Sequence, residues 1–265
     1  MKTILLCSLA LLGLASPLHA QIGEYRNELA IGVNGGVSMS SVSFLPEVPQ
    51  GQLIGPTVGL TVRYTGEKYF NSICTVVAEV NYARMGWKER IWDGDDQPVI
   101  NQATGLAEDY QRQLGYLQVP FFARLGWGRE RRGLQGYFQV GPQVAYMLSE
   151  KTKANFDLDH PNYYGRISNI SGPDIEVDGT VYHYSNMYHM AVENKFDYGI
   201  AAGAGLELSV PRVGHFLVEG RFYYGLGNIY GNTKRDYFAK SNFQNIVIKA
   251  SYLFDVVKSR NDKIK

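Results

Sequence analysis

The chain is dominated by runs in which apolar and polar residues alternate one by one. The clearest example covers residues 197–226, where two such runs flank the connection 211–214. In the first run every second residue from Tyr198 to Val210 is apolar, and charged, hydroxyl or small residues stand between them. A period of two predicts a β-strand with one apolar face and one polar or small face. Pro and Gly in the short connection predict a tight hairpin.

The same alternation recurs along the rest of the chain. It predicts eight strands, at residues 29–39, 54–64, 74–83, 116–127, 134–148, 197–210, 216–226 and 245–254. These runs exceed the roughly 5–6 residues of a usual strand and have the length of the about 9–11 tilted residues that cross a bilayer. Pro56 cannot donate a hydrogen bond to a neighbouring strand, so we expect it near a rim.

The connections between the predicted strands alternate in length. Long polar segments at 46–52, 88–109, 149–195 and 230–241 alternate with short turns at 65–71, 128–133 and 211–214. Outer-membrane barrels have long loops outside and short periplasmic turns. The sequence therefore predicts an all-β fold, an eight-stranded antiparallel up-and-down transmembrane β-barrel of residues 21–254 with long outer loops and both chain termini in the periplasm.

Two soluble folds are the alternatives. A β-sandwich gives no reason for the difference between long and short connections. A lipocalin-like barrel can also have eight strands, but its apolar face would line the lumen. The charged residues of the other face would then lie outside, and the many glycines on that face would have no explanation. The membrane barrel is therefore the preferred interpretation.

The two ends of the chain differ from the predicted barrel. Residues 1–20 predict a secretory signal peptide, with Lys2, an apolar run at 4–14 and a cleavage site after Ala20. The run is too short to span a membrane, and Cys7 lies inside it rather than after it, which argues against a lipoprotein. Residues 255–265 predict a polar periplasmic tail.

Charge and cysteine content narrow the possible partners. Removal of the signal peptide takes away one of the 26 basic residues and leaves the 25 acidic ones, so the mature chain is close to neutral and no nucleic-acid partner is expected. Cys74 is then the single cysteine, which excludes an intrachain disulfide. No later apolar run reaches the about 18 residues of a membrane helix, so a closed barrel is the remaining way to span a bilayer.

The second half of the chain resembles a known family of small outer-membrane β-barrels, the PorT-type or porin-like proteins. The resemblance is carried, in chain order, by Tyr116-Leu117-Gln118-Val119-Pro120, Gly141-Pro142-Gln143-Val144, the glycine-rich residues 199–205, Tyr223-Tyr224-Gly225-Leu226 and Tyr252-Leu253-Phe254. It implies an eight-stranded barrel in a Gram-negative outer membrane. The founding members assist type IX secretion, but residues 79–86 match them only generically, so this role is kept as an alternative.

The polar faces of the predicted strands carry a set of charged residues. Alternation points seven of them into the lumen: Arg63, Glu79, Arg124, Glu207, Glu219, Arg221 and Lys249. The set suits either a narrow selective pore or an internal ion-pair network that plugs the barrel. An eight-stranded barrel is just wide enough for side chains to fill, and buried charges persist only when paired. We therefore predict a plugged lumen.

The loops hold the residues that catalysis or metal binding would need. A lipid-modifying hydrolase would use a histidine with a serine and a carboxylate, and the 149–195 loop contains His160, His183, Ser185, His189 and Glu193. Their spacing matches no nucleophile motif. Oxygen-rich loops can hold calcium, but neither candidate cluster has the spacing of an EF-hand: Asp93, Asp95 and Asp96, and Asp157, Asp159 and His160. No catalytic, metal or cofactor site is predicted, and His215 is expected at a membrane interface.

The sequence thus predicts a non-enzymatic outer-membrane barrel with a structural or surface-interaction role. The tyrosine-rich 149–195 loop is the candidate contact surface. The expected partners are outer-membrane lipids and, in the alternative role, envelope or secretion-system proteins. A lipid-modifying hydrolase is the alternative from the enzyme class.

Overall fold

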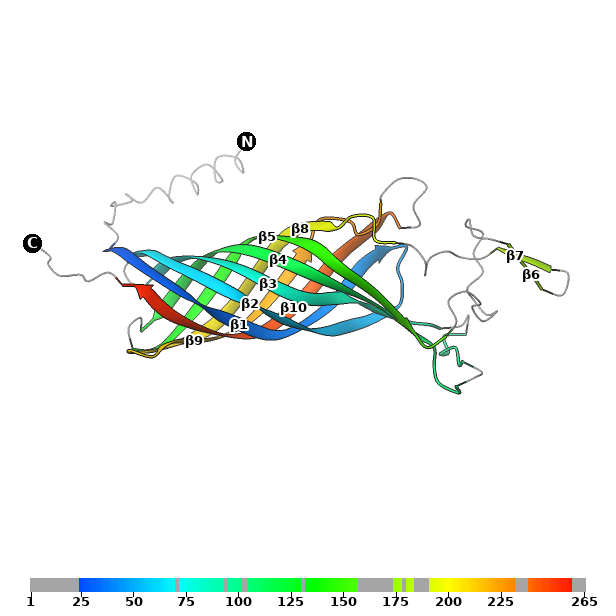
Figure 1. Ribbon diagram of the computed structural model, residues 1–265, viewed down its shortest axis with the longest axis horizontal. Helices are drawn as coiled ribbons and strands as arrows, with labels where there is room; N and C mark the ends of the chain where they lie inside the picture. The colour runs from blue at the N-terminus through cyan, green and yellow to red at the C-terminus, as the bar shows by residue number, and fades with distance from the viewer. Residues whose placement is uncertain are drawn as a thin grey trace, which may run out of the picture.

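The computed structural model describes residues 24–69, 72–92, 95–101, 104–129, 132–156, 174–177, 180–183, 191–231 and 238–258. Eight long strands close into a barrel (Figure 1). They are β1 (Glu24–Leu45), β2 (Gln50–Tyr69), β3 (Ser72–Arg90), β4 (Asp109–Gly128), β5 (Gly133–Ala154), β8 (Phe196–Val210), β9 (Gly214–Gly225) and β10 (Lys240–Val257). A separate hairpin consists of β6 (Asp174–Val177) and β7 (Thr180–His183).

The barrel strands follow one another around the ring in chain order. Every neighbouring pair is antiparallel, and β1 pairs with β10 from Leu29↔Val257 to Leu45↔Lys240, which closes the barrel. The predicted all-β, eight-stranded up-and-down barrel is therefore confirmed. Within the described ranges no helix is long and apolar enough to cross a membrane.

The two ends of the barrel differ in their connections. One end, called the turn end, carries the short connections 70–71, 129–132 and 211–213, and there β1 begins and β10 ends (left in Figure 1). The other end, called the loop end, carries the connections 46–49, 91–108, 155–195 and 226–239. The predicted long loop at 46–52 is only four residues in the structure, because β1 and β2 extend further than the alternation indicated.

The predicted division into an outer apolar face and an inner face holds over the part of the strands that the alternation indicated. On the outer face Ile54 and Val218 are 68% and 60% exposed, whereas Gln139 and Phe122 on the inner face are 0% and 1% exposed. Strands alternate their side chains between the two faces. The outer wall is therefore a band of exposed aliphatic and aromatic residues, and the inner face is filled.

The strands are longer than predicted, at 12 to 22 residues, because polarity reverses near the loop end. On β3 the inward residues there are Ala83, Met85 and Trp87, all buried, whereas the outward Arg84 and Arg90 are exposed. The strands were predicted from their apolar outer faces, so each predicted strand ends where this reversal begins. Trp87 lies four residues beyond the predicted end of this strand, and its side chain is inside the barrel and 2% exposed.

Two irregularities in strand pairing affect how residues are placed. Pro56 lies within β2 opposite Val37, and not at a rim as expected. The pairing of β2 with β3 shifts between Gln52 and Thr57, so a missing N–H is tolerated there. The second irregularity is in the pairing of β4 with β5. Gly115 pairs with Ser149 while Tyr116 pairs with Met147, so β5 contains one extra residue at this point. Such a β-bulge moves the following residues to the opposite face.

Candidate functional site

The turn-end half of the lumen contains the charged residues singled out in the sequence. Arg63, Glu79, Arg124, Glu207, Glu219, Arg221 and Lys249 all lie on inner positions, and none is more than 7% exposed. They come from β2, β3, β4, β8, β9 and β10. Most of the hydrogen bonds and ion pairs among these seven residues cross the lumen and join strands that are distant in sequence.

Glu79 is the carboxylate that joins β3 to β9 and β10. Its two oxygens accept hydrogen bonds of 3.0 Å each from Arg221, and Lys249 donates to it at 2.5 Å. Asn81 adds a bond of 2.8 Å from the same strand. Charge-assisted and two-point contacts of this kind are the stronger hydrogen bonds of proteins.

Glu219 continues the network on β9. It accepts a bond of 2.6 Å from Arg221, lies 3.4 Å from Lys249 Nζ and lies 3.8 Å from an Arg124 nitrogen. The Tyr137 hydroxyl donates to it at 2.9 Å, and Gln139 donates at 3.2 Å. Glu219 therefore links the cations of β4, β9 and β10 in one connected group.

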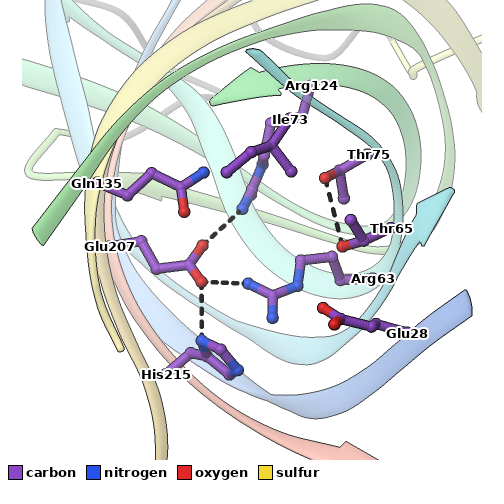
Figure 2. A pocket seen from close by; sticks show the side chains of 9 residues that line it. All are labelled: Glu28, Arg63, Thr65, Ile73, Thr75, Arg124, Gln135, Glu207 and His215. Carbon is purple, nitrogen blue, oxygen red and sulfur yellow. Dashed lines mark hydrogen bonds and ion pairs between the residues drawn. The ribbon is translucent and has the colours of Figure 1, made fainter. Parts of the chain in front are cut away.

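Glu207 holds the part of the network nearest the turn end. It accepts a hydrogen bond from Arg63 and lies 3.6 Å from Arg124 Nη1. His215 Nδ1 lies 2.9 Å from Glu207 Oε1, and its Nε2 lies 3.0 Å from Asp255 Oδ1 (Figure 2 shows the Glu207 contacts). A protonated imidazole can donate to both carboxylates at once.

His215 and Asp255 are lumen residues that sequence reasoning missed. His215 was expected at an interface and Asp255 in the polar tail, but His215 is only 8% exposed and β10 continues to Val257. Asp255 also lies 4.0 Å from Arg63. It supplies a fourth carboxylate to match the four cations. The signal was present, because both residues share the odd-numbered inner positions of their strands, with Glu219 and Lys249 respectively.

A small pocket opens between these groups and the turn end (Figure 2). Arg63, Arg124, Glu207 and His215 line it together with Glu28 and Gln135. Its cavity volume is about 30 Å³, which is room for about two water molecules. This size suits hydration of the network and leaves no space for an organic solute.

Neutral amides and hydroxyls form the next layer toward the loop end. Asn34 donates to Thr61 at 2.8 Å and to Asn81 at 2.9 Å, and Ser38 donates to Asn245 at 2.8 Å. Because Asn81 also binds Glu79, this layer is continuous with the ion pairs. Buried polar groups are normally satisfied in this way.

Aromatic side chains fill the lumen nearest the loop end. The Phe44 ring centroid lies 5.3 Å from that of Trp87 and 4.5 Å from that of Phe238, and the Tyr230 and Phe238 centroids are 5.7 Å apart. Aromatic pairs at 4.5–7 Å pack favourably. Phe238 and Tyr230 come from the β9–β10 connection. This group, with neighbouring apolar residues, is called the aromatic plug.

Arg112 lies on the inner face and contacts the aromatic plug. It donates hydrogen bonds to Glu150 and lies 3.3 Å from the hydroxyls of Tyr110 and Tyr230. Burial raises the pKa of the Tyr230 phenol, so this hydroxyl stays protonated. Glu150 faces inward because the β5 bulge precedes it. The alternation predicted no aromatic plug, because polar or small residues were expected on the inner faces.

Tyr223→Phe should destabilise the folded barrel by about 1–3 kcal/mol, because buried Asp197 loses a donor. The Tyr223 hydroxyl donates to Asp197 at 2.7 Å, and both residues are at most 5% exposed. The measurement is reversible urea unfolding in lipid vesicles followed by tryptophan fluorescence. Tyr146→Phe, on the outer face at 50% exposure, is the matched control. Equal stabilities of the two variants would contradict a structural role for this bond.

Most of the catalytic and metal candidates fall in the loops. Asp93, Asp157, Asp159, His160, Ser185 and His189 lie outside the described residues. His183 ends β7, and Glu193 is exposed before β8. Among described residues no group of three or more His, Cys, Asp or Glu side chains is arranged to hold a metal ion. The candidates whose side chains the structure does describe, Asp95, Asp96 and Glu193, belong to no such group.

A comparison with known protein families shows the family to which the chain belongs. The family described as outer membrane protein beta-barrel domain matches residues 19–231, which is most of the chain. The chain belongs to this family. As an outer membrane protein beta-barrel domain, it lies in the outer membrane, where its exposed apolar band contacts lipid. The predicted location is thereby confirmed. No curated protein matches the chain.

Three similar solved structures are distant in sequence. Ail of Yersinia pestis, in complex with the heparin analogue sucrose octasulfate, is 13% identical, with 86% of this chain and 99% of that chain covered and a TM-score of 0.32. Neisserial surface protein A is 9% identical, with coverage of 85% and 97% and a TM-score of 0.36. OprG of Pseudomonas aeruginosa is 10% identical, with coverage of 88% and 98% and a TM-score of 0.38. Similarity at this level says nothing about the partner or role of this barrel.

Proposed function

We propose that this protein is a non-enzymatic, non-conducting outer-membrane barrel that acts through surface contacts of its loop end. The observation that carries the proposal is the filling of the lumen by buried side chains, which leaves room only for a few water molecules beside the ion pairs. Four cations and four carboxylates close its turn-end half, and the aromatic plug closes its loop-end half. Opening a path for solutes would require breaking several buried ion pairs, which is costly.

Surface contacts are the role left to such a barrel. The connections 91–108, 155–195 and 226–239 all leave from the loop end. Long loops of outer-membrane barrels lie on the extracellular side, and short turns lie in the periplasm. The signal peptide predicted at residues 1–20 would export the chain across the inner membrane.

The folded protein should show no stepwise ion conductance in planar lipid bilayers, because no continuous aqueous path crosses the paired charges and the aromatic plug. The recording uses protein whose folded state is verified by heat-modifiable gel mobility, and an open porin inserted under the same conditions is the positive control. Stable open channels in the intact protein would overturn the proposal of a plugged lumen.

Accessory action in type IX secretion rests on the PorT-type resemblance of the sequence, and the lipid-modifying hydrolase rests on loop histidines. Neither gains support from the contacts of the described residues. Cross-linking in intact cells with identification of the captured proteins distinguishes secretion components from other envelope partners.

A further inference from the structure

The outer face of the barrel changes from apolar to cationic at the loop-end edge of β3 and β5. Five basic side chains gather there: Arg84, Lys88, Arg90, Lys151 and Lys153. We call this group the cationic patch. From this patch we infer a binding site for phosphate-bearing lipid headgroups, namely the lipid A phosphates of the outer leaflet. The inference deepens the proposed function and rests on it for the orientation of the loop end.

Strand pairing places the five cations side by side. Lys88 pairs with Gln111 of β4, which pairs with Lys153 of β5. One step nearer the membrane, Gly86 pairs with Gln113, which pairs with Lys151, and Arg84 follows on β3. Neighbouring strands are about 4.8 Å apart, so cations on β3 and β5 are separated by roughly 10 Å across the uncharged β4 positions.

Acidic residues of this region are kept away from the patch. Glu150 is exposed, but its carboxylate is paired with Arg112 of the inner face, and Glu89 and Glu108 are 5% and 3% exposed. The outward acid among the paired positions is Asp109, which lies 2.9 Å from Lys88 Nζ. Arg84, Arg90, Lys151 and Lys153 form no ion pair with a described residue and are exposed. Five cations with one carboxylate leave an excess of four positive charges on this face.

The position of the patch selects a lipid as its occupant. Directly below it lie the exposed outer residues Val80, Leu117, Tyr146 and Leu148. These residues belong to the band that contacts acyl chains, with Tyr146 at its edge as in an interfacial aromatic girdle. A ligand that fits this surface has acyl chains next to anionic groups. Long basic side chains extend along apolar surface and present their charge to headgroups, and arginine binds phosphate with two hydrogen bonds.

The test uses the mature, refolded protein in detergent, titrated with diphosphorylated lipid A and measured by native mass spectrometry. The patch variant combines Arg84→Gln, Lys151→Gln and Lys153→Gln. The matched control combines Arg129→Gln, Arg132→Gln and Arg212→Gln, which removes three exposed cations at the turn end. Both variants must show the wild-type heat-modifiable mobility.

The patch variant should bind lipid A on the order of 10- to 100-fold more weakly than the wild type, because each basic residue contributes substantially near an anionic surface. The control should stay within about twofold, and added salt should weaken wild-type binding through screening. Dephosphorylated lipid A should bind the wild type as weakly as lipid A binds the patch variant. Equal binding of lipid A by the wild type and the patch variant, or of both lipids by the wild type, would overturn the inference.

The orientation is tested separately in intact cells. Thr104→Cys at the loop end and Val213→Cys at the turn end are placed in a Cys74→Ser background, and a membrane-impermeant thiol reagent is added. Labelling of Thr104→Cys alone supports the proposed function. Labelling of Val213→Cys alone would overturn the orientation in the proposed function, whereas the lipid titration reports on the patch in either orientation.

Discussion

Glu79→Ala should destabilise the folded barrel by about 3–5 kcal/mol, because it leaves a buried arginine and a buried lysine without their main carboxylate. Arg221 and Lys249 both bind Glu79 and are 5% and 3% exposed. Glu219 alone would then have to compensate them. The measurement is urea unfolding in lipid vesicles, followed by tryptophan fluorescence and by the gel mobility of the unheated protein.

Two further variants make this result specific to the network. Glu47→Ala removes an exposed carboxylate in the β1–β2 connection and should change the free energy of unfolding by less than about 0.5 kcal/mol. Glu79→Gln combined with Lys249→Met removes one charge of each sign and should recover much of the lost stability. A Glu79→Ala barrel as stable as the Glu47→Ala barrel would show that the ion pairs do not hold the lumen together.

Val140→Arg should destabilise the barrel in a bilayer by about 2–4 kcal/mol, because a charged side chain on the lipid face is costly at the membrane midplane. Val140 is 42% exposed at the middle of β5, and its partners on both neighbouring strands are alanines, Ala123 and Ala202. The comparison of urea unfolding between the wild type and the variant in the same vesicles gives the magnitude.

Val213→Arg is the control for this substitution. Val213 is 50% exposed in the β8–β9 turn, where an added charge remains in water and should cost little. Val140 on the outer face and Val213 in the turn thus have similar exposure, but one is expected to face lipid and the other water. If Val140→Arg is as harmless as Val213→Arg, the band that includes Val140 does not contact acyl chains.

The hairpin of residues 197–226 shows how much of this fold the sequence could predict. Every second residue of β8 and β9 lies on the expected face, so one pattern yielded the strand type and the face of each residue. The inner positions of Arg221 and Glu207 followed from the same alternation. The residues that Arg221 and Glu207 contact could not be predicted from the alternation. Glu79 meets residues 142 and 170 positions away, and such pairings depend on how strands face one another across the closed ring.

The loop-end half was harder to predict for a different physical reason. Phe44 and Trp87 point inward, while Arg84 and Lys88 point outward. An apolar side chain can lie against lipid or against other side chains inside a barrel, and composition alone does not distinguish the two. Asp255 was missed because an assumed strand end removed it from the alternation, although β10 continues past it.

The extra residue of β5 has an effect on both surfaces of the wall. Because Ser149 follows it on the outer side, Glu150 reaches Arg112 within, and Lys151 and Lys153 stand outside. Shortening this strand by one residue would exchange the two sides, bringing two lysines against the buried rings and placing a carboxylate among membrane phosphates. The length of a single strand therefore determines both which side chains fill the lumen and which charges face the membrane.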